Sequence, residues 1–168
     1  DVDGASIADL LEAKGLTWMQ FAEGYPGGCF QQKVQGDYVR KHVPFISFKS
    51  IQNNPERCAN IRNAEEFDPT HLPNYAFYSP DNKNDGHDTK LDYAANWLKG
   101  FLEPLLNDSK IMKDTLIVVT FDAVKKGYVS NQPVDHYDLL RTIEDNFALD
   151  TLGQEDTKAS AVADVWMK

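Results

Sequence analysis

Seven consecutive residues, Thr115 to Phe121 (TLIVVTF), form a run that is apolar almost throughout and rich in β-branched side chains. Such a run is typical of a strand that is buried on both faces of a parallel sheet. Two other runs, Leu16 to Glu23 and Asn74 to Tyr78, also predict strands. We therefore expect an α/β domain whose buried central strand is Thr115 to Phe121.

Segments with helical spacing separate these runs. Ser6 as an N-cap, with Asp9 three residues later, predicts a helix at the start of the chain. Further helices are expected near residues 45–51, 93–105 and 135–147. Because strands that alternate with helices indicate βαβ units, we predict a mainly parallel sheet with helices on both faces, built as a single domain over residues 1–168.

Charge and hydropathy exclude several classes of partner. The 168 residues are 42% hydrophobic, which is enough for a packed core. Lysine and arginine number 17 against 26 aspartates and glutamates, so the formal net charge is −9. This balance argues against nonspecific nucleic-acid binding and against an anionic membrane surface. No apolar run approaches the roughly 20 residues that cross a bilayer.

The two cysteines and one sequon bear on the compartment. Cys29 and Cys58 are too few for a disulfide-rich scaffold or a structural zinc site. Spacing alone leaves two readings: a pair of buried thiols, or one bridge that stabilises the fold by roughly 3–4 kcal/mol. Asn107 begins an N-glycosylation sequon in a polar stretch. Together these features favour a secreted protein.

Acidic and imidazole side chains follow the predicted strands. Asp122 comes directly after the TLIVVTF run, and the loop after residue 78 carries Asp85, His87 and Asp88. His136 lies at the start of the last predicted helix. Ligands of open α/β sheets bind beyond the carboxyl ends of the strands, where carboxylates and imidazoles suit a divalent metal ion. The alternative is that these residues only form turns and helix caps.

A small basic group, Arg40, Lys41 and His42, interrupts the acidic chain. It is either a substrate-side group for an anionic ligand or a solvated surface. The chain contains no GxSxG, P-loop, GxGxxG or HExxH motif.

A series of longer motifs runs in order along almost the whole chain. They are residues 7–15 (IADLLEAKG), 17–18 (TW), 25–27 (YPG), 29–30 (CF), 38–42 (YVRKH), 44–47 (PFIS), 57–61 (RCANI), 84–89 (NDGHDT), 97–98 (WL), 101–106 (FLEPLL), 115–122 (TLIVVTFD), 136–137 (HY), 142–146 (TIEDN) and 151–153 (TLG). In this order they resemble the fungal secreted acid phosphatases of the phosphoesterase family.

The resemblance implies an alkaline-phosphatase-like α/β fold and hydrolysis of phosphoric monoesters through a divalent metal ion. By motif, Asp85 and His87 are similar to metal ligands of the first loop. Asp122 matches the ligand after the central strand, and His136 the ligand of the last segment. Asp88 matches a residue that supports a ligand. The substrate implied is a small phosphoester.

The resemblance also implies a Cys29–Cys58 disulfide and a secreted location. The chain departs from the family pattern in three places. The family carries its metal-binding Glu-Asn pair and its Ser or Thr nucleophile ahead of the matched region, so this chain is expected to be a C-terminal portion without the nucleophile. Ala123 stands where the family has Glu, and the loop before His136 is short.

Three explanations of these departures remain open. The chain is a piece of a larger phosphatase whose missing N-terminal portion completes the site; or it is a noncatalytic secreted binding or effector protein derived from the family; or it is a compact enzyme with a rebuilt site.

Overall fold

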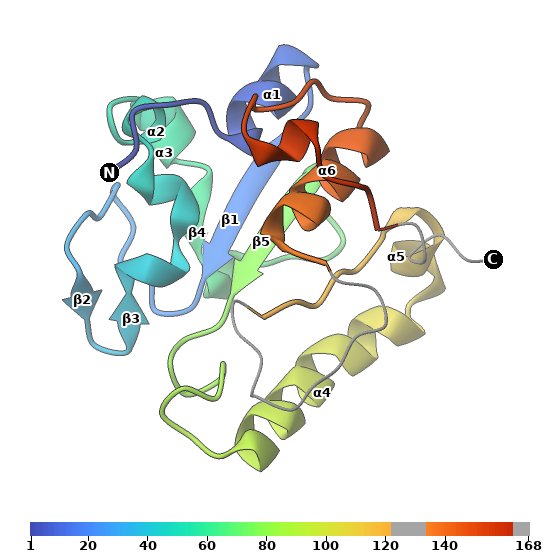
Figure 1. The fold of residues 1–168 in the computed structure, drawn as a ribbon. Helices are drawn as coiled ribbons and strands as arrows, with labels where there is room; N and C mark the ends of the chain where they lie inside the picture. The colour runs from blue at the N-terminus through green and yellow to red at the C-terminus, as the bar shows by residue number, and fades with distance from the viewer. Residues whose placement is uncertain (122–133, 163–168) are drawn as a thin grey trace. The chain divides into compact units, whose positions relative to one another are not determined.

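The computed structural model describes residues 1–121 and 134–162, which form parts of two compact units, Asp1–Thr115 and Leu116–Lys168. Figure 1 shows the helices and strands. The first unit contains α1 (Ile7–Ala13), β1 (Trp18–Ala22), β2 (Val34–Gln35), β3 (Tyr38–Val39), η1 (Arg40–His42), η2 (Pro44–Ser47), α2 (Lys49–Gln52), α3 (Pro55–Cys58), β4 (Ile61–Asn63), η3 (Ala64–Glu66), β5 (Tyr75–Ser79), α4 (Leu91–Asn107) and α5 (Ser109–Asp114). The second contains α6 (His136–Asn146) and η4 (Glu155–Thr157).

The main sheet is parallel and has the order β4-β1-β5 (Figure 1). Its register pairs Trp18 with Tyr75 and Ala22 with Ser79, so β1 and β5 end at the same level. Helices lie around this sheet, and the predicted α/β class is confirmed. A separate antiparallel pair, β2 and β3, lies in a stretch for which the sequence predicted no strand.

Aromatic side chains cover both faces of the sheet. On one face, Phe45 of η2 stacks on Trp18, with ring centroids 4.5 Å apart, and packs edge-on against Phe77 at 6.4 Å. On the other, Phe101 of α4 lies 4.5 Å from Tyr78, which is one residue further along β5. Successive strand residues point to opposite faces, so η2 and α4 bury the two sides of the same strand.

The start of the chain is fixed by capping and by one arginine. Ser6 donates from its N–H and its hydroxyl to the Asp9 carboxylate, at 2.7 and 2.9 Å, as the sequence predicted. Arg57 of α3 donates to Asp9 at 2.7 Å and to Glu12 at 2.8 and 2.9 Å. Glu12 also accepts the indole N–H of Trp18 at 2.8 Å, so one ionic network joins α1, α3 and the core.

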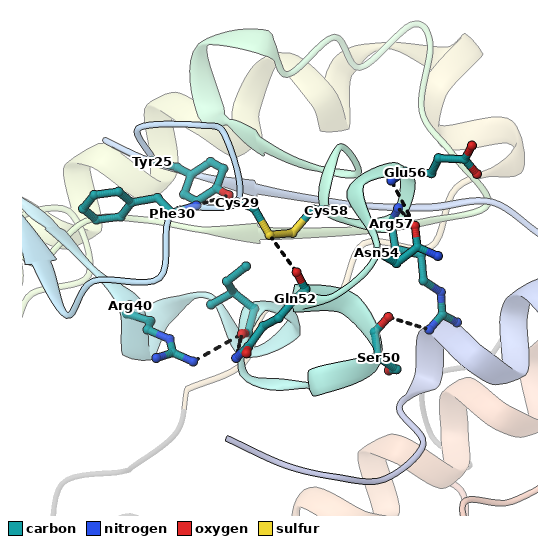
Figure 2. Close-up of a disulfide and its surroundings, with 11 residues drawn as sticks. Tyr25, Cys29, Phe30, Arg40, Ser50, Gln52, Asn54, Glu56, Arg57 and Cys58 are labelled. Carbon is teal, nitrogen blue, oxygen red and sulfur yellow. Dashed lines mark hydrogen bonds between the residues drawn. A yellow bond between two sulfur atoms is a disulfide. The ribbon is translucent and has the colours of Figure 1, made fainter.

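Cys29 and Cys58 form a disulfide, as the family resemblance implied (Figure 2). It links the loop after β1 to the end of α3, and the Cys29 sulfur lies 3.6 Å from the carbonyl oxygen of Gln52. Beside it, the Tyr25 hydroxyl accepts the N–H of Phe30 at 3.2 Å (Figure 2). The bridge therefore ties a turn-rich loop to the helical layer.

The prediction that Thr115 to Phe121 is the buried central strand is wrong. The structure assigns no strand to this run, and Val118 and Phe121 are 51% and 62% exposed. A strand forms only where another strand accepts its backbone hydrogen bonds, and no strand of the described residues pairs with this one. The central position belongs to β1, which has a neighbour on each side.

In the second unit, α6 begins as the sequence predicted. Asp135 is its N-cap and accepts the N–H groups of Tyr137 and Asp138 at 2.7 and 3.1 Å. No helix in the described part of either unit is long and apolar enough to cross a bilayer.

Candidate functional site

The candidate site lies where β1 and β5 end, at the carboxyl edge of the parallel sheet, which is where α/β proteins bind ligands. Residues 80–89, here called the 80–89 loop, leave β5 at this edge and lead into α4. The loop carries Asp85, His87 and Asp88, three of the residues that the sequence singled out. All three therefore start from the expected edge of the sheet.

Glu23, the residue after β1, holds the start of this loop. One of its carboxylate oxygens accepts the backbone N–H of Asp81 at 2.8 Å and the side-chain amide of Asn84 at 2.7 Å. The other accepts the hydroxyl of Tyr78 at 3.1 Å. Burial raises the pKa of Tyr78, and the neighbouring Glu23 charge raises it further, so the phenol stays protonated and donates.

Turns within the loop orient Asp85 and His87. The Asp81 carboxylate accepts the N–H of Asn84 at 2.9 Å, and the Asp85 carboxylate accepts the N–H of His87 at 2.7 Å. Gly86 sits between them with φ +86°, and a Cβ there would approach the Cβ of Ala94 to 3.2 Å. The positive φ therefore favours glycine, and a side chain there would crowd Ala94 of α4.

His42 contacts the loop from η1. Its Nδ1 lies 3.2 Å from the carbonyl oxygen of Pro80, and its Nε2 lies 3.4 Å from the Asp85 carboxylate. A carbonyl oxygen only accepts, so Nδ1 carries the proton in that contact. Of the three residues in the basic group, His42 is thus the one that lies against Asp85.

His87 and Asp88 form a pair at the outer side of the loop. Nδ1 of His87 lies 2.7 Å from the Asp88 carboxylate, and both side chains are more than half exposed. A carboxylate on one ring nitrogen orients the imidazole and leaves Nε2 for a ligand. The supporting role expected for Asp88 stays a prediction.

Arg40 and Lys41 do not join the loop. Arg40 pairs with Asp1 and donates to the carbonyl oxygens of Gln31 and Ile46, at 3.2 and 3.3 Å. Lys41 is exposed. Arg40 is therefore engaged in holding the N-terminal segment.

Asp122 and His136 are not placed relative to this loop. Asp122 lies outside the described residues, and His136 is an exposed residue at the start of α6 in the second unit. The convergence of Asp85, His87, Asp122 and His136 stays a prediction.

The 80–89 loop carries some, but not all, of the ligands that a divalent cation needs. Within the ranges 1–121 and 134–162, no group of three His, Cys, Asp or Glu side chains is arranged to hold a metal ion. The loop nevertheless offers a carboxylate in Asp85 and an imidazole in His87. The side-chain oxygen of Asn82 is also buried there without a hydrogen-bond partner in the described part of the chain, and a carbonyl oxygen in that state can accept a cation or a donor. The loop therefore offers some of the groups that a divalent cation would need.

Sequence reasoning missed two residues of this edge, Glu23 and Gln20. Gln20 is fully buried in β1; its amide N–H donates to the carbonyl of His42 and the hydroxyl of Ser79, at 3.1 and 3.3 Å. The available signal was a polar residue inside an apolar strand and a carboxylate directly after it. Because buried polar groups need partners, both positions are candidates on this signal, although the signal does not say which groups they contact.

Residues 1–124 match the Phosphoesterase family. The chain belongs to this family. Among curated proteins, it is similar to a probable acid phosphatase of Kluyveromyces lactis, with 37% identity over 190 aligned positions. An acid phosphatase of Aspergillus fumigatus is 31% identical over 188 positions. A phosphatidylinositol-3-phosphatase of Mycobacterium tuberculosis is 28% identical over 185 positions.

These matches cover nearly all of this chain and a smaller part of each relative. They include 94%, 93% and 98% of the chain, but 45%, 42% and 60% of the three relatives. The chain thus spans less than half the length of the Kluyveromyces lactis and Aspergillus fumigatus proteins. The alignment with the Kluyveromyces lactis protein is longer than the 168-residue chain, so that relative carries internal residues that this chain lacks. No solved structure matches the chain.

Proposed function

We propose that this chain forms part of a phosphoesterase that hydrolyses small phosphoric monoesters with a divalent metal ion. The observation that carries the proposal is the 80–89 loop: Asp85 and His87 lie at the carboxyl edge of the sheet and are held there by Glu23, His42 and Asp88. The names of the fungal relatives supply the reaction class.

In this proposal Asp85, His87, Asp122 and His136 hold the ion, and Asp88 orients His87. A bound divalent ion would neutralise phosphoryl oxygens and acidify a water molecule. His42, whose Nε2 lies 3.4 Å from the Asp85 carboxylate, is the member of the basic group that we place on the substrate side. The nucleophile is left to the part of the larger protein that this chain does not include, and the protein is proposed to be secreted, with a glycan on the exposed Asn107.

Removing either loop ligand should weaken metal binding. We expect Asp85→Asn and His87→Ala each to lower the affinity for Mn²⁺ or Zn²⁺ by at least about 10-fold, because replacing even a residue that supports a ligand costs 10–100-fold. Isothermal titration calorimetry on the 168-residue chain measures this directly. His71→Ala is the matched control, since His71 pairs with Asp68 at an exposed position and its side chain is 83% exposed.

Turnover of p-nitrophenyl phosphate at acid pH, with and without EDTA, tests the reaction. EDTA-sensitive activity that follows the 168-residue species and falls in Asp85→Asn would support the compact enzyme with a rebuilt site and would overturn the placement of the nucleophile outside this chain. Equal metal affinity in Asp85→Asn, His87→Ala and His71→Ala would refute the ligand assignment. Phosphate binding without turnover is expected both of a portion that lacks the nucleophile and of the noncatalytic binding protein, to which Ala123 in place of the family's Glu points. Turnover by a longer species that includes the nucleophile separates these two.

A further inference from the structure

We propose that Glu23 is a positioning residue: from the end of β1 it sets the conformation of the 80–89 loop and thereby the placement of Asp85 and His87. The inference rests on the proposed function, since Asp85 and His87 matter as ligands only there. Glu23 itself is separated from both residues by about 60 positions of sequence.

The pairing of β1 with β5 places Glu23 beside the 80–89 loop. Ala22 pairs with Ser79 in the parallel ladder, and the N–H of Glu23 continues that ladder by donating to the carbonyl of Ser79 at 3.1 Å. The backbone of Glu23 is therefore fixed one residue beyond the last pair. Its side chain starts at the level where the 80–89 loop leaves β5.

The two oxygens of the Glu23 carboxylate accept different hydrogen bonds. One oxygen accepts two N–H groups of the loop, from Asp81 and from the Asn84 side chain, and the other accepts the Tyr78 hydroxyl. No lysine, arginine or histidine of the described residues forms an ion pair with Glu23, so these hydrogen bonds are what balances its charge. Hydrogen bonds to an ionised acceptor are about twice as strong as neutral ones.

The contacts continue from Glu23 to the candidate ligands. Asp81, held by Glu23, accepts the N–H of Asp85 at its carbonyl oxygen at 3.0 Å. Asn84, also held by Glu23, is the residue directly before Asp85. Asp85 in turn accepts the N–H of His87 at 2.7 Å. Removing the Glu23 carboxylate frees two anchors on the N-terminal side of both ligands.

Two variants separate the role of the side chain from its charge. Glu23→Ala removes all three contacts. Glu23→Gln keeps one carbonyl oxygen for the N–H groups of Asp81 and Asn84, and its amide can donate to the Tyr78 hydroxyl, which is able to accept. Asp37→Ala is the matched control, because Asp37 holds the same loop through an exposed ion pair with Lys83 at 2.7 Å.

The test is amide hydrogen exchange of the 168-residue chain, followed by NMR at Asp85 and Asp88. Their N–H groups bond to the carbonyls of Asp81 and Asn82 rather than to Glu23, so they report the loop and not the deleted contact. We expect at least about 10-fold faster exchange in Glu23→Ala and less than about 3-fold in Glu23→Gln and Asp37→Ala. The N–H of Gln20, bonded to Asn60 in the sheet, should not change.

Unchanged exchange at Asp85 and Asp88 in Glu23→Ala would overturn the proposal, as would equal acceleration at Gln20, which would indicate general destabilisation. Mn²⁺ affinity completes the test: it should fall about 10-fold or more in Glu23→Ala and recover in Glu23→Gln. A loosened loop with unchanged affinity would also overturn the positioning role. If the wild-type chain binds no metal, the proposed function fails, while the exchange data still decide whether Glu23 sets the loop.

Discussion

Removal of the Cys29–Cys58 disulfide is expected to lower the free energy of unfolding by roughly 3–4 kcal/mol. The two cysteines are 29 residues apart. Without the bridge, the segment between them gains chain entropy mainly in the unfolded state, which is thereby favoured. Cys58 is buried, so the substitutions should be small and apolar. Urea unfolding of the Cys29→Ala, Cys58→Ala double variant, compared with the oxidised wild type, measures the loss.

Backbone conformation suggests the control for this experiment. Cys29 has φ 59°, a left-handed conformation that costs a side-chain residue energy when no bridge holds it. A Cys29→Gly, Cys58→Ala variant removes the same bridge without that cost in the folded state. Equal stability of the oxidised and reduced wild type would contradict the expected contribution of the bridge.

Glu144 should make the stability of the chain fall as pH rises from about 5 to 8. Glu144 and Asp156 are both fully buried, and neither oxygen of Glu144 has a hydrogen-bond donor among the described residues. Burial raises the pKa of Glu144 to about 7, and the adjacent Asp156 charge adds to the rise, while Arg141 opposes it. The Asp156 carboxylate accepts the N–H groups of Leu152 and Gln154 at 2.6 Å, and a protonated Glu144 can donate to it as well.

The sign follows from the folded and unfolded pKa values of Glu144. A raised pKa means that the folded state holds the proton more tightly, so the stabilisation is complete below pH 4.5 and is lost as pH rises through about 7. A shift of that size corresponds to about 3 kcal/mol. The pKa of Asp156 is lowered below 3.8 despite burial, because backbone N–H groups hold the charge, so its contribution is lost only in stronger acid.

Glu144→Gln isolates this effect, since glutamine donates an N–H to Asp156 at every pH. Between pH 5 and 8 the wild type should lose about 2.5 kcal/mol more than Glu144→Gln, as measured by urea unfolding followed by circular dichroism. Glu155→Gln is the control, because Glu155 is exposed and pairs with Lys158 at 3.1 Å. The same pH dependence in wild type and Glu144→Gln would show that a proton held by Glu144 against Asp156 is not the cause.

Local sequence determined the elements whose stabilising contacts lie within a few residues. The capping contacts of Ser6 with Asp9, and of Asp135 with the first turn of α6, each span three residues or fewer, so both helix starts could be predicted. β1 and β5 were predicted from their apolar pattern, which a strand needs wherever it pairs. The order of motifs along the chain also indicated the family, which the match over residues 1–124 establishes.

Pairing and burial were decided by the tertiary structure. Thr115 to Phe121 has the composition of a central strand, yet a strand exists only with a neighbour that completes its hydrogen bonds, and composition does not name that neighbour. The sequence marks Glu23 as a carboxylate directly after a strand but does not name its partners, because Asp81 and Asn84 become adjacent to it only when β1 and β5 pair in register. The sequence by itself determined the helix caps, two strands and the family; the sheet order and the residues that hold the 80–89 loop depend on contacts between distant segments.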